Sequence, residues 1–182
     1  AALFWALAGD WDPRVLTRGG FRPNAGPRIP SYREYRRQVE RQSVLYYKDG
    51  AAATVSIGDF DGDLRHLRVN GKVDASTGLG DRTTQVLIGH LPLLLRPGSR
   101  SALLIGLGSG MTAAAMLTHP IERLDLAELS PEVVTASRYF EPGNGRPLAD
   151  GRLRLHVQDG RSLLKLGTRR YDAIVSEPSN PW

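Results

Sequence analysis

Residues 101–111 read Ser-Ala-Leu-Leu-Ile-Gly-Leu-Gly-Ser-Gly-Met, and this stretch decides the fold. The apolar run 101–105 predicts a buried strand, and the Ala-rich run 111–117 predicts a helix. Glycines at 106, 108 and 110 allow a strand to turn sharply into a helix and allow a ligand to approach bare backbone. The same spacing also occurs in ordinary tight turns, so the stretch predicts a strand, a turn and a helix but does not by itself establish a ligand.

The pattern of strand and helix continues after this stretch. Ser130 and Pro131 begin a helix as its N-cap and its first helical residue. Because strands and helices alternate, the sequence predicts a parallel, doubly wound α/β sheet. The expected strands are 101–105, 123–129, 152–158 and 171–176, and the expected helices are 81–95 (N-capped near Asp81), 111–117, 131–139 and 161–166.

Upstream, residues 43–76 show the alternation and turns of a small antiparallel meander. The β-type runs are 44–47, 53–57 and 64–69, and Asn70-Gly71 is a typical hairpin signal. The predicted organisation has three parts: a linker or membrane-segment stub over 1–42, a β-meander domain over 43–80, and an α/β domain over 81–182.

Acidic residues follow the expected strands at their carboxyl ends. Glu128 comes 22 residues after Gly106, where a carboxylate can accept hydrogen bonds from both ribose hydroxyls. Asp159-Gly160 ends the third strand, where a carboxylate can meet an adenine amino group, and Glu177 follows the fourth. Each of these residues alone could be a solvent-exposed strand end. Because open α/β sheets bind ligands at this edge, their coincidence predicts an adenosine-type site.

Composition excludes several classes of protein. The 182 residues contain no Cys, which excludes a disulfide scaffold, a thiolate zinc site and a cysteine nucleophile. Lys and Arg number 24 against 19 acidic residues, a net charge of +5 that permits contact with nucleic acid. In the densest basic run, Arg33, Arg37 and Arg41 would share one face of a helix, diluted by acidic neighbours. A solvated helix face is the preferred interpretation, and no nucleic-acid partner is expected.

The two ends of the sequence favour a fragment of a longer protein. The chain begins at Ala1 without Met and stops at Trp182. Residues 1–9 are apolar but shorter than the ~18 residues of a membrane span. They are either the tail of a membrane helix or a short buried helical turn.

Several motifs in series resemble the spermidine synthase-like, or polyamine aminopropyltransferase, family, which is related to class I methyltransferases. The resemblance rests on residues 67–72, 90–92, 106–110, 128–134, 159–160 and 171–175. It implies a small N-terminal β-domain followed by a Rossmann-like sheet of which four strands are present, so the sheet is expected to be truncated after strand four. Residues 11–16 with 19–21 resemble the linker of bacterial members fused to a membrane-helix bundle. The chain is therefore expected to be membrane-associated or cytoplasmic, and a homodimer is a further expectation.

The family reaction transfers an aminopropyl group from decarboxylated S-adenosylmethionine to a diamine such as putrescine. The sulfonium is a good leaving group, so the enzyme must orient the amine and keep it unprotonated, without a metal. The resemblance implies Glu177 as the base or amine ligand. It implies a donor site formed by Gly106, Gly108, Ser109, Gly110, Glu128, Asp159 and Gly160, and an acceptor pocket formed by Asp74, Gln85 and Asn180.

This sequence departs from the family pattern mainly around the acceptor. Ser109 stands where synthases carry Asp, and Asn180 stands where they carry a second Asp. Thr84-Gln85 replaces a Tyr-His pair, and Asp74 replaces a Gln. Two alternatives to aminopropyl transfer therefore stay open: a methyltransferase that uses S-adenosylmethionine, and a membrane-attached module that binds thioadenosine without catalysis.

Overall fold

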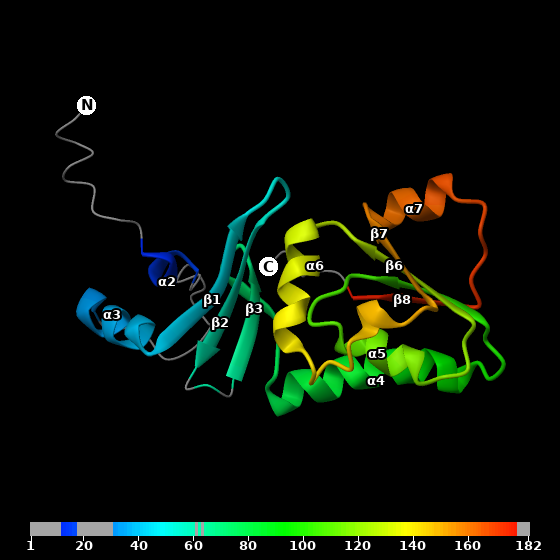
Figure 1. Cartoon of the computed structure of the whole chain (residues 1–182), viewed down its shortest axis with the longest axis horizontal. Coiled ribbons are helices and arrows are strands. Elements are labelled where there is room, and N and C mark those ends of the chain that lie inside the picture. The colour runs from blue at the N-terminus through cyan, green and yellow to red at the C-terminus, as the bar shows by residue number, and fades with distance from the viewer. Residues whose placement is uncertain (1–11, 18–30, 61, 63, 178–182) are drawn as a thin grey trace.

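The computed structural model describes residues 12–17, 31–60, 62 and 64–177. Within these residues the chain forms two four-stranded sheets with helices around them (Figure 1). The elements are α2 (Pro13–Leu16), α3 (Tyr32–Glu40), β1 (Gln42–Asp49), β2 (Thr54–Phe60), β3 (Leu64–Val69), β4 (Lys72–Ser76), α4 (Leu79–Leu95), β5 (Ser101–Ile105), α5 (Met111–Leu117), β6 (Arg123–Glu128), α6 (Pro131–Ser137), the 3-10 turns η1 (Arg138–Phe140) and η2 (Pro147–Ala149), β7 (Leu153–Val157), α7 (Gly160–Leu166) and β8 (Ala173–Ser176).

The first sheet is the predicted antiparallel meander, in the order β1-β2-β3-β4. Its last hairpin turns at Asn70 and Gly71, whose φ angles are 49° and 77°. Two successive residues with positive φ are the requirement of a type I′ turn, which explains the Asn-Gly pair. The Asn70 side chain also accepts a hydrogen bond from the Thr54 backbone N–H at 2.9 Å, which ties the turn to β2.

The second sheet is parallel, in the order β7-β6-β5-β8, and confirms the predicted α/β class. Its central strand β5 is the apolar run of the deciding stretch, and Ala102, Leu103 and Leu104 are fully buried. Figure 1 shows α4 and α5 on one side of this sheet and α7 on the other. Strand order reverses between β5 and β8, so the glycine turn after β5 and Glu177 after β8 are neighbours at the switch point.

The two sheets share one hydrophobic core. Val55, Ile57, Leu67 and Ala75 of the meander belong to the same buried cluster as the residues of β5 and β6. At the junction the Tyr46 and Tyr139 rings lie 5.7 Å apart, so α6 and the turn after it connect the sheets. The meander is therefore fixed relative to the carboxyl edge of the parallel sheet.

Helix α4 begins earlier than the sequence predicts. It starts at Leu79 with Gly78 as N-cap, and Asp81 lies in the first turn. The prediction that the helix is capped near Asp81 is wrong because the carboxylate accepts a hydrogen bond from the Ser76 hydroxyl. The helix thus crosses the predicted domain boundary at residue 80.

The predictions for the N-terminal region are tested only in part. Residues 1–11 lie outside the described residues, so the membrane-segment stub stays a prediction, as do the membrane attachment and the homodimer. Residues 12–17 contain the short helix α2, and α3 occupies the predicted basic helix. No helix in the described part of the chain is long and apolar enough to span a membrane.

Gly89 of α4 packs tightly against α5, which leads to a stability prediction. A Cβ on Gly89 would lie 2.7 Å from the Thr112 carbonyl oxygen and 2.8 Å from the Ala115 Cβ. We expect Gly89→Ala to lower the free energy of unfolding by about 1–3 kcal/mol, measured by urea denaturation, because the two helices must separate.

Gly80 of the same helix provides the matched control. A Cβ there meets no atom within 4 Å. Gly80→Ala is therefore expected to leave stability unchanged or raise it by up to about 1 kcal/mol, because alanine has the higher helix propensity. Equal destabilisation by both substitutions would contradict the close packing at Gly89.

Candidate functional site

The glycine turn forms the centre of the candidate site. Gly106, Gly108 and Gly110 all have positive φ, at 96°, 53° and 89°. An L side chain rarely adopts these angles, so the chain reverses here with bare backbone. Gly160, at the start of α7, is equally constrained by space, because a Cβ there would lie 2.7 Å from the Ile105 side chain. The start of α7 therefore packs closely against the end of β5.

Glu128 is locked against this turn. It is 9% exposed, and its Oε2 accepts a hydrogen bond from the Leu107 N–H at 2.9 Å. Its Oε1 accepts another from the Ser130 N–H, also at 2.9 Å. Charge-assisted bonds of this kind fix the carboxylate beside the glycine backbone. The structure therefore places Glu128 next to the turn, and its ribose contact stays a prediction.

Asp159 has a different environment, because its carboxylate is exposed at the start of α7. It accepts hydrogen bonds from the Ser162 N–H at 2.9 Å and the Ser162 hydroxyl at 2.8 Å. The hydrogen bond from the Ser162 side chain lowers the pKa of Asp159, which is therefore ionised at neutral pH. Asp159 caps the helix, and its predicted adenine contact remains untested.

Ser109 and Gln85 contact each other. Ser109 is fully buried, and its hydroxyl donates a hydrogen bond to the Gln85 side-chain oxygen. The Gln85 amide in turn donates to the Asp81 carbonyl at 3.2 Å. These two predicted site residues therefore link α4 to the glycine turn, which holds the turn in shape. Their predicted ligand contacts are not tested by this arrangement.

Glu177 lies at the switch point, immediately after β8. Its backbone N–H donates to the Ile105 carbonyl at 2.9 Å, and its Oε2 lies 2.6 Å from the Thr112 hydroxyl. Burial raises the pKa of Glu177, the Thr112 hydrogen bond lowers it, and the negative charge of Asp81 raises it. The net effect is upward, which makes Glu177 a better proton acceptor than an exposed glutamate.

The predicted acceptor residues fall in different places. Asp74 lies on β4 and forms an ion pair with Lys72. Asn180 lies outside the described residues. Within the described ranges, no cluster of three or more His, Cys, Asp or Glu side chains offers a metal site. The prediction of a metal-free reaction stays a prediction.

Sequence reasoning missed two residues that act on Glu177, and a third that is buried with an unsatisfied side chain. Thr112 and Asp81 are found only through their contacts with Glu177 and Ser76, which lie far away along the chain. Gln42, on β1, is 2% exposed, and within the described residues neither atom of its side-chain amide has a hydrogen-bond partner. Leaving a buried amide unsatisfied costs about 1–3 kcal/mol. No sequence signal distinguishes this glutamine from others.

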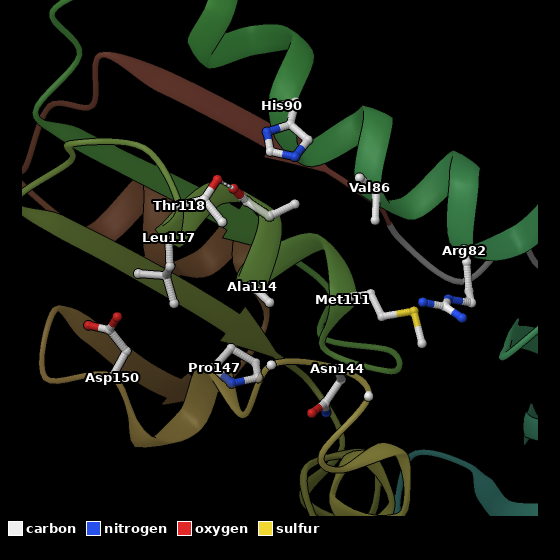
Figure 2. Close-up of a pocket in the computed structure, with 13 residues that line it drawn as sticks. Arg82, Val86, His90, Met111, Ala114, Leu117, Thr118, Asn144, Pro147 and Asp150 are labelled. Atoms are coloured by element: carbon white, nitrogen blue, oxygen red, sulfur yellow. Dashed lines mark hydrogen bonds between the residues drawn. The ribbon is translucent and has the colours of Figure 1, made fainter.

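A cavity of about 450 Å³ lies between α4, α5 and residues 143–150, away from the predicted site residues. Figure 2 shows Arg82, Val86 and His90 of α4 facing α5 across it, with Asn144, Pro147 and Asp150 on the opposite side. Asn144 already donates to the Ser109 carbonyl at 2.9 Å, and the hydrogen bond from Arg152 lowers the pKa of Asp150 to about 2. None of the predicted site residues lines this cavity, so we place the chemistry at the carboxyl edge of the sheet.

Comparison with known proteins identifies the family of the chain. Residues 82–182 match the family described as the spermine/spermidine synthase domain. The chain belongs to this family. The synthase-domain match covers α4 from Arg82 onward, the glycine turn, Glu128, Asp159 and Glu177, which form the candidate site.

The relatives of this synthase-domain chain include two kinds of enzyme. Putrescine N-methyltransferase 3 of Nicotiana tabacum is 34% identical over 117 residues, which are 63% of this chain and 30% of the relative. Spermidine synthase of Coffea arabica is 37% identical over 101 residues, which are 53% of this chain and 31% of the relative. The chain thus spans about a third of the length of these curated relatives.

Two solved structures share the fold. Spermidine synthase from Thermotoga maritima superposes with a TM-score of 0.68 at 20% identity, over 76% of this chain and 48% of that chain. A spermidine synthase in complex with the transition state analogue AdoDATO superposes with a TM-score of 0.70 at 20% identity, over 76% and 47%. These matches confirm the predicted Rossmann-like sheet preceded by a small β-domain.

Proposed function

We propose that this chain binds decarboxylated S-adenosylmethionine and transfers its aminopropyl group to an amine, for which a diamine such as putrescine is the first acceptor to test. The observation that carries this proposal is Glu177, a half-buried carboxylate with a raised pKa beside the glycine turn. Membership of the synthase-domain family supports the class of reaction, and the names of its relatives point to polyamine substrates.

The donor would lie along the carboxyl edge of the parallel sheet. The backbone of Gly106, Gly108 and Gly110 would approach the nucleoside because no side chains intervene. Glu128 would accept hydrogen bonds from the ribose hydroxyls through the lone pairs that Leu107 and Ser130 leave open. Asp159 and Gly160 would border the adenine.

The transfer step is a displacement at the methylene carbon next to the sulfonium. The lone pair of the amine nitrogen forms the new C–N bond while the C–S bond breaks. The electron pair of the C–S bond stays on sulfur, which gives neutral methylthioadenosine. Glu177 would accept the proton that the amine nitrogen loses. Thr112 would orient the accepting carboxylate through its 2.6 Å hydrogen bond.

Methyl transfer from S-adenosylmethionine is the second candidate. It is favoured by putrescine N-methyltransferase 3 of Nicotiana tabacum, which matches 117 residues of this chain, against 101 for the spermidine synthase of Coffea arabica. The same displacement would then attack the sulfonium methyl group, with Glu177 in the same role.

Product analysis separates the two candidates. The purified chain is incubated with putrescine and either decarboxylated S-adenosylmethionine or S-adenosylmethionine, and the nucleoside products are identified by mass spectrometry. We expect methylthioadenosine from the decarboxylated donor. S-adenosylhomocysteine as the sole product would establish the methyltransferase alternative, and absence of both products would refute group transfer to putrescine by this chain.

A further inference from the structure

The hydroxyl group of Thr112 lies between two oxygen atoms from different parts of the chain. Thr112 is the second residue of α5 and is only 1% exposed. Its Oγ1 lies 2.6 Å from Oε2 of Glu177, which follows β8, and 3.1 Å from the backbone carbonyl oxygen of Gln85 in α4. Both distances allow a hydrogen bond, so the position of the one hydroxyl hydrogen decides how the three groups interact.

The number of hydrogens available to the three groups limits what they can form. A threonine hydroxyl donates one hydrogen and accepts through two lone pairs. The Gln85 carbonyl can only accept, so its hydrogen bond must use the hydrogen of Thr112. The second contact then needs a hydrogen from Glu177, which only a protonated carboxyl has. Both contacts are therefore complete hydrogen bonds only when Glu177 is protonated on Oε2, because an ionised Glu177 takes the Thr112 hydrogen for itself.

We propose that Thr112 is a positioning residue whose hydroxyl reverses direction when Glu177 gains or loses a proton. In the acid form, Glu177 Oε2 donates to Thr112 Oγ1, and Thr112 donates to the Gln85 carbonyl. In the ionised form, the hydroxyl rotates about its C–O bond and donates to the carboxylate. Both forms of Glu177 are then hydrogen-bonded, although no carbon, nitrogen or oxygen atom moves. This inference rests on the proposed function, because it assigns the reversal to the base of the transfer step.

The surroundings of Glu177 make the hydroxyl important to its ionised form. Among the described residues, Thr112 is the hydrogen-bond donor to this carboxyl, and Asp81 of α4 is the charged group that acts on it. Strands β5 and β8 and helix α5 contain no charged residue. Burial raises the pKa of Glu177, the hydrogen bond from Thr112 lowers it, and the charge of Asp81 raises it. Removal of the hydroxyl should therefore raise this pKa further, because the ionised form loses its donor.

Carbon NMR of the isotope-labelled chain tests the reversal without donor or amine. The side-chain carboxyl carbon of Glu177 reports its ionisation, and the carbonyl carbon of Gln85 reports whether it accepts from Thr112. We expect both signals to titrate with the same midpoint, and the Gln85 carbonyl carbon to move to higher frequency as the pH falls. The carbonyl carbon of Val134, which accepts from the Ser137 hydroxyl at 2.9 Å, should not titrate with that midpoint.

Substitutions of Thr112 separate the effect of the hydroxyl from that of the side-chain shape. Thr112→Val keeps the shape, and should raise the pKa of Glu177 and abolish the titration of the Gln85 carbonyl. It should also lower the rate of group transfer below that pKa by about tenfold more than at high pH, because less of the base is ionised. Thr112→Ser keeps the hydroxyl, and should retain the wild-type titration and pH–rate profile.

Thr118→Val is the matched control. It makes the same change at the other end of α5, where the hydroxyl donates to the Ala115 carbonyl at 2.7 Å. The titrations of Glu177 and Gln85 and the pH–rate profile should all stay at the wild-type values.

The outcomes separate this inference from the proposed function. A Gln85 carbonyl that does not titrate with Glu177 in the wild type, or that still titrates in folded Thr112→Val, would overturn the reversal and leave Glu177 as the base. If Thr112→Val does not fold, the titrations of the wild type and of Thr112→Ser decide the question. Coincident titrations in a chain that transfers no group would uphold the reversal and overturn the proposed function.

Discussion

Glu177→Gln is expected to slow group transfer by about 10²–10⁴-fold while leaving methylthioadenosine binding nearly unchanged. The substitution keeps the shape of the side chain and its contact with Thr112, but an amide cannot accept the proton that the amine loses. Single-turnover rates with saturating donor measure the loss directly. Glu122→Gln, the same change at an exposed ion pair with Arg100, is the matched control and should retain full activity.

The same substitution should make the fold more stable. The pKa of Glu177 is higher in the folded state than in the unfolded state. At pH values between the ordinary pKa of glutamate and this raised pKa, the folded state therefore binds more protons than the unfolded state. The carboxyl of Glu177 does not destabilise the fold at pH values below the ordinary pKa of glutamate. As the pH rises from that value through the raised pKa, the buried carboxyl ionises and the free energy of unfolding decreases. A glutamine cannot ionise, so Glu177→Gln should melt above the wild type at neutral pH and together with it below about pH 4.

Two results would contradict this account of Glu177. Retention of more than about a tenth of the transfer rate would show that another group accepts the proton. A melting-temperature difference that does not depend on pH would show that the carboxylate is not held in a poorly hydrated environment.

Glu128→Gln is expected to weaken methylthioadenosine binding by about 100-fold and to destabilise the fold by about 1.5–3 kcal/mol. The carboxylate accepts one backbone N–H on each oxygen, from Leu107 and from Ser130. A glutamine has one oxygen, so its NH₂ group must face one of the two N–H donors. That donor is left unsatisfied in a buried place, and the glycine turn loses one of its restraints.

The two effects of Glu128→Gln test different statements. The loss of stability, measured by urea denaturation, follows from the hydrogen bonds alone. The loss of affinity, measured by calorimetry, follows only if the carboxylate also holds the ribose, so a destabilised variant with wild-type affinity would refute the ribose contact. Glu122→Gln again serves as control, because Glu122 precedes the same strand at its opposite, exposed end.

Local signals predicted the elements that carry the site. The apolar run followed by three spaced glycines predicted a strand, a turn and a helix, and Asn70-Gly71 predicted a hairpin, since both depend on the φ angles that particular residues allow. The position of Glu128 beside the turn was likewise predictable, because the carboxyl ends of adjacent parallel strands meet at one edge. The positions of Asp159 and Gly160 after β7 follow from the same rule.

Contacts between distant residues were not predictable in this way. Nothing near Thr112 in the chain indicates that its hydroxyl lies 2.6 Å from Glu177, 65 residues later. Asp81 was expected to cap a helix, but Ser76 offers it a hydroxyl once β4 and α4 are in place. The side chains of Ser109 and Gln85 form a hydrogen bond with each other, and no sequence pattern around either residue predicts it.

The amino-acid sequence by itself determined the order of strands and helices, the glycine turn and the residues that end each strand, because these depend on backbone conformation and on the period of apolar residues. Only the tertiary structure decided the charges and hydrogen bonds of the site. Packing of the meander against the parallel sheet fixes which side chains lose water, and burial then raises the pKa of Glu177.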